Sequence, residues 1–117
     1  MTVKSQGARA AWAWGVMAVA IVLLVAATTA PAQDAALVQR GAQLFTEQGC
    51  YGCHTVGKFG TQGIAPDLSR VGAKHDVAYL TKWLQDPASQ KPTAHMPKIG
   101  VSADEAKALA AYLGSLK

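Results

Sequence analysis

The chain has 117 residues, half of them hydrophobic, and a formal net charge of +4 at pH 7. This length holds one small domain plus an apolar segment, and it leaves no room for a sensor's output domain. The basic residues are scattered and no recognition motif is visible, which excludes nucleic acid as a partner. Both cysteines belong to one short motif, so none remains for a structural disulfide.

The first 32 residues form an export signal or a membrane anchor. Residues 1–10 carry Lys4 and Arg9 without an acidic residue, and the following run, 11–27, is apolar and uncharged. A basic end followed by an apolar run directs the rest of the chain across the cytoplasmic membrane. We therefore expect residues 33–117, the second predicted domain, to be periplasmic.

Two alternatives remain open for this first segment. The apolar run is barely long enough to span a membrane, and Trp12 and Trp14 stand where an interfacial aromatic belt would lie. The small residues at 30–32, Ala-Pro-Ala, instead resemble a cleavage site before Gln33. The pattern predicts either a signal peptide cleaved after Ala32 or a retained anchor helix.

A helix is predicted from Asp34, the candidate cap, to Gly49, the candidate terminator. Its apolar residues recur at helical spacing along one face: Leu37, Gly41, Leu44 and Phe45. A glycine in mid-helix costs about 1 kcal/mol against alanine. Gly41 therefore indicates the close approach of another helix.

The motif that follows is Cys50-Tyr51-Gly52-Cys53-His54. Two cysteines three apart with a histidine after the second are the attachment signal of a c-type haem, in which each thiol adds to a vinyl group and the histidine binds the iron. One helical turn sets both sulfurs on the same side of the chain. The alternatives are a redox pair, half a zinc site or a disulfide. A redox pair needs a surrounding βαβ pattern and zinc needs four ligands, and neither is evident.

A glycine-rich loop, residues 57–68, is predicted to wrap against a flat ligand. Asp76 then caps a second helix that continues through Asp86 and ends at Pro87. The apolar face of this helix comprises Val77, Leu80, Trp83 and Leu84. Trp83 is either a core residue or a contact to a haem propionate through its N–H.

Residues 88–100 contain two prolines and are predicted not to be helical for long. Within them lies Met96, the only methionine outside the export segment. It is either core filler or the axial ligand that a six-coordinate haem needs opposite His54. His95 and His75 are the competing ligands, but His95 adjoins Met96, and His75 precedes a helix and is expected at the surface.

A capping box, Ser102 to Glu105, opens the last helix, which is expected to continue through Leu116. Its small alanines permit close packing, and its natural partners are Gly41 and Phe45. No strand-like stretch is found.

In this order the motifs resemble those of a class I (monohaem) cytochrome c of the small bacterial type, over nearly all of 37–116. The resemblance implies an all-α fold with about three to four short helices packed around one covalently attached haem. It also implies that the first and last helices cross at Gly41, with Phe45 beside Tyr112. The motifs that carry it are Gly41-x-x-Leu44-Phe45, Cys50-x-x-Cys53-His54, Gly63-x-x-Pro66-x-Leu68, Trp83-Leu84-x-Asp86-Pro87, Met96-Pro97 and Glu105 through Leu113.

The resemblance also assigns the site. Cys50 and Cys53 hold the haem, and His54 and Met96 are the axial ligands. The carbonyl of Pro66 accepts a hydrogen bond from the free ring nitrogen of His54, which fixes the tautomer and orientation of this ligand.

The expected function is one-electron transfer by the iron of a haem c, because His/Met ligation leaves no open position for a substrate. We therefore expect no enzyme and no small-molecule substrate. A peroxidase-like protein and a gas sensor are weaker alternatives, and the strongest is a membrane-anchored haem c subunit of a larger respiratory or dehydrogenase complex.

The expected partners are redox proteins, such as a quinol-oxidising complex, a dehydrogenase or a terminal oxidase, with membrane contact possible through 11–30. Without Lys4 and Arg9 the chain keeps 9 basic and 7 acidic residues, a charge of +2. A mildly basic face suits docking onto an acidic partner through a small interface. The long lysine collar of the mitochondrial relatives is not apparent.

Overall fold

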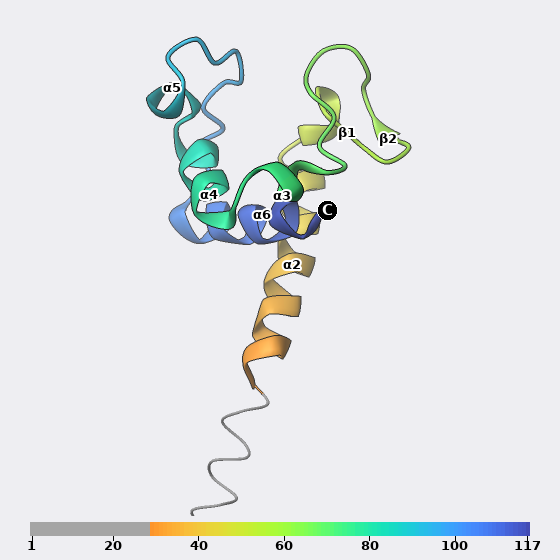
Figure 1. Cartoon of the computed structure of the whole chain (residues 1–117), viewed down its shortest axis with the longest axis vertical. Helices are drawn as coiled ribbons and strands as arrows, with labels where there is room; N and C mark the ends of the chain where they lie inside the picture. The colour runs from red at the N-terminus through yellow and green to blue at the C-terminus, as the bar shows by residue number, and fades with distance from the viewer. Residues whose placement is uncertain (1–28) are drawn as a thin grey trace, which may run out of the picture. The chain divides into compact units, whose positions relative to one another are not determined.

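A computed structural model describes residues 29–117, so the predicted apolar run at 11–27 lies outside the described residues. In the described part of the chain, no helix is both long and apolar enough to cross a membrane. Residues 34–117 form one compact unit. Its elements are drawn in Figure 1, and their bounds are α2 (Thr29–Glu47), η1 (Cys50–Gly52), β1 (Thr55–Val56), β2 (Phe59–Gly60), α3 (Val71–Lys74), α4 (Val77–Gln85), α5 (Pro87–Gln90) and α6 (Ala103–Ser115).

The described residues are mostly helical, as predicted, but they hold five α-helices where three to four were expected. The difference comes from α3 and α5, each a single turn of four residues that is too short to show a periodic pattern. Asp86 caps α5, its carboxylate accepting from the N–H of Ser89 at 3.2 Å. Pro87 ends α4, as predicted, and also occupies the first turn of α5, where no N–H is needed.

Helix α2 begins earlier than predicted. It starts at Thr29, so Asp34 lies inside the helix and does not cap it. The preceding residues are alanine-rich, and Pro31 falls in the first turn, where proline is tolerated. The predicted end is confirmed, because α2 stops at Glu47 and Gly49 has the left-handed conformation (φ 71°) typical of helix termination.

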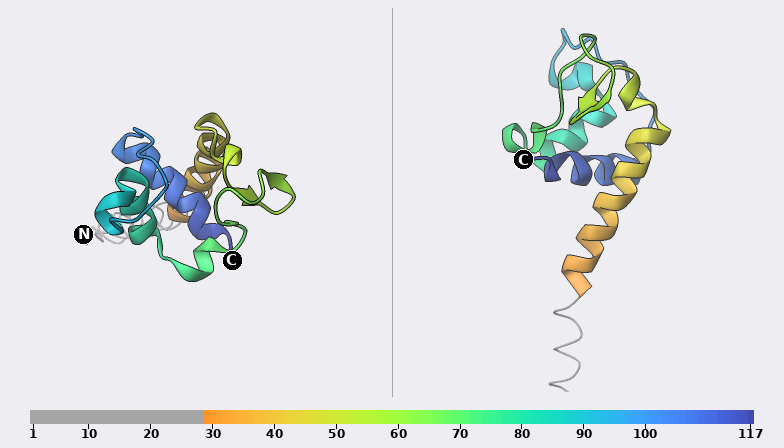
Figure 2. Two further views of the ribbon diagram at one scale, coloured as in Figure 1. Left: turned by 90° about the horizontal axis from the view of Figure 1, so that it is seen from above. Right: turned by 90° about the vertical axis from the view of Figure 1, so that its right-hand side faces the viewer.

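Helices α2 and α6 cross closely, and Figure 2 shows α6 lying across α2 from two directions. At Gly41 an added Cβ would overlap the carbonyl oxygen of Ala108 and lie 2.6 Å from the Cβ of Tyr112. Phe45, 2% exposed, meets Tyr112 edge to face with ring centroids 5.6 Å apart. The structure thus confirms the predicted crossing and the reason for Gly41.

Two residues expected on apolar faces are exposed. Leu37 is 40% exposed because it lies one helical turn before the crossing point with α6. Val77 is 46% exposed in the first turn of α4, where the helix only begins to pack. The main cluster of buried apolar side chains comes from α2, α4 and α6: Leu44, Phe45, Leu80, Leu84, Ala106, Ala108, Leu109, Ala110 and Leu113. Pro87 of α5 is also buried.

A small antiparallel hairpin, which the sequence did not predict, follows the cysteine motif. Thr55 pairs with Gly60 and Val56 with Phe59, around a two-residue turn that opens with Gly57 at φ 60°. Two residues per strand are too few to produce an alternating pattern. This hairpin and the segment after α5 rise on the same side of α6 (Figure 1).

The predicted caps of the other two long helices are confirmed. The Asp76 carboxylate accepts from the N–H of Tyr79 at 2.7 Å at the start of α4. The Ser102 hydroxyl accepts from the N–H of Glu105 at 3.2 Å, and the Glu105 carboxylate accepts from the N–H of Ser102 at 2.8 Å. Helices α4 and α6 therefore begin where the sequence places them.

Candidate functional site

The two cysteines lie at either end of one tight helical turn. Gly49 turns the chain out of α2, and η1 begins at Cys50. The N–H of Cys53 and the N–H of His54 both donate to the carbonyl of Cys50, at 3.2 Å and 2.9 Å. Because the turn is closed by these bonds, the two thiols and the imidazole leave the chain within one turn of each other.

The environment of the thiols does not favour a redox pair. Burial raises the pKa of the Cys50 thiol, whereas Cys53 is exposed. Redox-active cysteines have thiol pKa values that are lowered by nearby positive charge or a helix N-terminus. Both cysteines are free, so this turn presents two thiols, the groups that add to haem vinyls.

The imidazole of His54 is held by the backbone of the following loop. Its Nδ1 lies 2.8 Å from the carbonyl oxygen of Pro66, the contact that the resemblance implied. A carbonyl only accepts, so Nδ1 carries the proton and Nε2 keeps a free lone pair. A histidine in this tautomer is ready to bind a metal ion through Nε2.

One cavity, of about 240 Å³, collects five of the six residues that the sequence analysis selected, namely Cys50, His54, Pro66, Trp83 and Met96. The sixth residue, Cys53, is exposed and does not line this cavity. Apolar side chains form most of the rest of the wall: Phe45, Leu68, Val71, Leu80, Leu84 and Leu113. Four polar or aromatic residues complete it: Asp67, Lys74, His75 and Tyr79. A largely apolar cavity with a thiol, an imidazole and a thioether at its wall offers the chemical groups that hold a haem.

Met96 and Trp83 contact each other at the wall of this cavity. The indole Nε1 of Trp83 donates to the Sδ of Met96 at 3.2 Å, and both side chains are half-buried. The sequence analysis had considered only core packing or a propionate for this N–H. A thioether sulfur has two lone pairs, so one remains for a metal ion.

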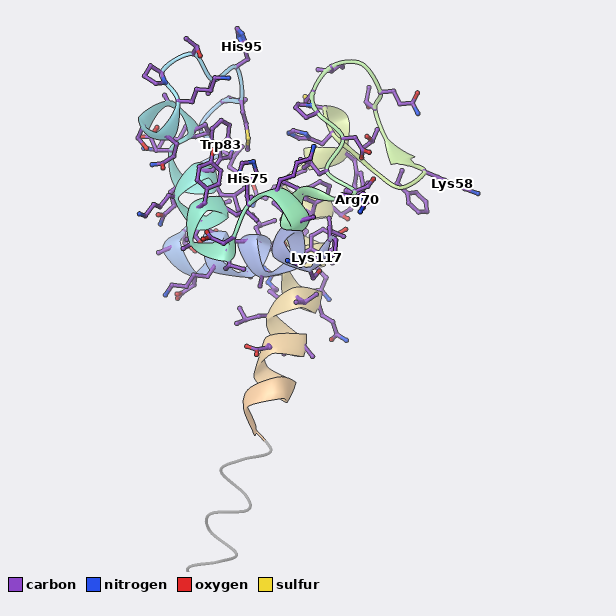
Figure 3. The ribbon with its side chains drawn as sticks, in the orientation of Figure 1. Lys58, Arg70, His75, Trp83, His95 and Lys117 are labelled. Atoms are coloured by element: carbon purple, nitrogen blue, oxygen red, sulfur yellow. The ribbon has the colours of Figure 1, made fainter. Side chains whose placement is uncertain are left out.

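His75 was expected at the surface, and its side chain is exposed, but it also lines the cavity. Its ring stacks on Tyr79 with centroids 4.4 Å apart, and Tyr79 stacks on Trp83 at 6.1 Å. The spacing of four residues along the start of α4 was the available signal for this stack, and the sequence analysis missed it. Figure 3 shows His75 and Trp83 near each other along α4, whereas His95 lies at the outer end of its loop. His95 is exposed and does not line the cavity.

The comparisons with known proteins identify the family of this chain. The sequence model of the family described as cytochrome c matches residues 38–117. The chain belongs to the cytochrome c family. It is also 37% identical, over 90 residues, to a protein of Alkalihalophilus pseudofirmus named cytochrome c oxidase subunit 2. That alignment covers 69% of this chain and 26% of the relative, so the chain spans about a quarter of the relative's length.

Membership of this family establishes the cofactor and the general activity. The protein binds haem c covalently, with its iron, and it takes part in haem-based electron transfer. The residues at the cavity fit this group, because the motif supplies two free thiols and the wall supplies one imidazole and one thioether.

Proposed function

We propose that the protein is a one-electron carrier whose haem iron is bound by His54 and Met96. The observation that carries this proposal is that both side chains, from segments far apart in sequence, line the same apolar cavity. The hydrogen bond from Nδ1 of His54 to Pro66 supports the first ligand, because it leaves Nε2 free. The second ligand is supported by the half-buried side chain of Met96, whose sulfur is held at the cavity wall by Trp83.

Cys50 and Cys53 are the attachment points in this proposal. Their thiols add to the two haem vinyls, so the haem stays bound in either oxidation state of the iron. When bound, the haem supplies exchange of one electron between ferrous and ferric iron. The protein orients His54 through Pro66, holds Met96 beside Trp83 and excludes water with its apolar wall.

This ligand set makes the protein a carrier and not an enzyme. With an imidazole and a thioether bound, no coordination position remains for oxygen, peroxide or another substrate. A thioether also favours ferrous iron and raises the reduction potential, which suits exchange with other redox proteins. Its partners in this proposal are therefore electron donors and acceptors on the outer face of the cytoplasmic membrane, to which the basic and apolar start of the sequence directs the chain.

A second candidate function is a haem c subunit of a respiratory complex, anchored by residues 11–30. The observation that favours it is the similarity to a protein named as an oxidase subunit, in which the matching region is only part of a longer chain. Both candidates use the same haem chemistry and differ in partners and in the fate of the first 32 residues.

The first test is an optical spectrum of the purified native protein, oxidised and reduced, together with its intact mass. We expect a sharp c-type α band on reduction and, in the oxidised form, the weak far-red band of iron bound to methionine sulfur. A high-spin spectrum that shifts with added ligands would overturn the assignment of Met96. A mass beginning at Gln33 supports the free carrier, and a mass that retains the apolar run supports the anchored subunit.

A further inference from the structure

A network of hydrogen bonds joins the two segments that follow His54 and Pro66. Thr55 is 9% exposed, and among the residues that the structure describes it is the one polar side chain that is buried. Its hydroxyl donates to the Oδ1 of Asp67 at 3.1 Å. The same oxygen accepts from the N–H of Ser69 at 3.0 Å and from its hydroxyl at 2.6 Å. We call these three residues, Thr55, Asp67 and Ser69, the clasp.

Backbone contacts extend the clasp along both segments. The Ser69 hydroxyl accepts from the N–H of Gly57 at 2.8 Å, and the N–H of Leu68 donates to the carbonyl of Thr55 at 2.8 Å. Each of these bonds therefore ties residues 55–57 to residues 67–69. Both segments start one residue beyond the partners of the hydrogen bond from His54 to Pro66.

Pro66 depends on its neighbours for its position. Proline has no N–H, so its own backbone cannot anchor the loop by donating a hydrogen bond. The amides of neighbouring residues anchor the loop instead. The N–H of Ala65 donates to the carbonyl of Cys53 at 3.2 Å, and the N–H of Leu68 donates to the carbonyl of Thr55. Only on the Leu68 side do side chains, those of the clasp, reinforce the backbone bond.

We infer that Thr55 and Asp67 are positioning residues for His54, which set the length of its hydrogen bond to Pro66 and thereby the reduction potential. This inference rests on the proposed role of His54 as a haem ligand. A strong hydrogen bond at Nδ1 makes the imidazole a more basic ligand, which stabilises ferric iron. Loosening the clasp weakens this bond, since hydrogen bonds weaken steeply as distance and angle depart from their optimum. The reduction potential then rises.

The variant that tests this without a change of charge is Thr55→Val, made in the full chain with haem attached. It removes the hydroxyl and keeps the shape of the side chain. We expect a higher reduction potential. We also expect the Nδ1 proton of His54 to exchange faster by about fivefold to tenfold. NMR of the reduced protein follows this exchange. Thr55→Ser keeps the hydroxyl and should restore both values.

A matched control is Thr81→Val in α4. The hydroxyl of Thr81 donates to the carbonyl of Val77 at 2.7 Å, so this variant also loses one hydrogen bond without a change of charge. We expect Thr81→Val to leave the potential and the exchange of the His54 proton unchanged. Equal shifts in Thr55→Val and Thr81→Val would overturn the inference, because general loosening would then explain both.

Two variants of Asp67 distinguish the effect of its position from the effect of its charge on the reduction potential. Asp67→Asn keeps an oxygen acceptor and loses the charge, whereas Asp67→Ala loses both. We expect the alanine variant to raise the potential more than the asparagine variant, and equal shifts would contradict a positioning role. The spectrum of the native protein distinguishes failure of the proposed function from failure of this inference. A haem that is not bound through His54 would overturn the proposed function. A normal spectrum with unchanged potentials in these variants would overturn only the positioning role of the clasp.

Discussion

The indole N–H of Trp83 lies 3.2 Å from the sulfur of Met96 and donates a hydrogen bond to it. The two residues come from α4 and from the loop after α5, so this bond joins the helical wall of the cavity to the segment that carries the proposed second ligand. A donor on the sulfur withdraws electron density from it, which makes the thioether a weaker ligand for ferric iron.

Trp83→Phe should therefore lower the reduction potential. The variant keeps an aromatic ring and removes only the donor. A hydrogen bond has a net worth of about 0.5–1.5 kcal/mol, which limits the shift to about 20–60 mV for a one-electron couple. Protein voltammetry measures it. Tyr79→Phe is the control, since it removes a hydroxyl from the same aromatic stack and leaves the Trp83 donor in place; a similar shift in both variants would rule out the hydrogen bond as its cause.

Met96→Ala should leave the haem attached through its thioethers and open one iron position. We expect the reduced variant to bind carbon monoxide, the reduction potential to fall and the free energy of unfolding to drop by about 2–4 kcal/mol. Ile99→Ala, in the same loop and packed against the same core, is the control for lost apolar contact. An iron that stays closed to carbon monoxide in Met96→Ala would show that another side chain is the ligand.

Gly41→Ala tests the crossing of α2 and α6. The added methyl group overlaps the carbonyl of Ala108, so the helices must separate. Overpacking of this kind costs about 1–3 kcal/mol, although alanine is otherwise the better helix former. Gly52→Ala, where an added Cβ meets nothing within 4 Å, is the matched control. Chemical denaturation compares the two, and a Gly41→Ala protein at least as stable as the native one would contradict the crossing.

Tyr112 makes the free energy of unfolding depend on pH in the alkaline range. Burial, with a smaller contribution from a hydrogen bond to Tyr51, raises the pKa of Tyr112 to about 12. In the unfolded chain a tyrosine loses its proton near pH 10, so between about pH 10 and 12 the folded state binds more protons than the unfolded state. The free energy of unfolding therefore falls as the pH rises through this range, whereas below pH 10 the contribution of Tyr112 is fully present.

The Tyr112→Phe variant isolates this contribution from every other effect of alkaline pH on stability. We expect the difference in stability between the native protein and the variant to shrink from pH 9 to pH 12. A difference that stays constant over this range would mean that Tyr112 has the same pKa in both states.

The sequence alone determined the parts of this protein that depend on local chemistry. The attachment motif, the caps at Asp76 and Ser102 and the end of α2 near Gly49 each lie within a few consecutive residues, so their physical cause is readable in the chain. The crossing at Gly41 was also predicted, because a mid-helix glycine carries a cost that only close packing offsets.

Tertiary structure decided what depends on residues far apart in sequence. The single turns α3 and α5 and the two-residue hairpin are too short to leave a periodic signal. Contacts of α3 with α6, of α5 with α4 and of β1 with β2 hold them. The donation from Trp83 to Met96 and the clasp between Thr55 and Asp67 each span 12 or 13 positions. A side chain that could donate to several acceptors forms its hydrogen bond with the acceptor that packing brings to about 3 Å. No local sequence pattern specifies which acceptor that will be.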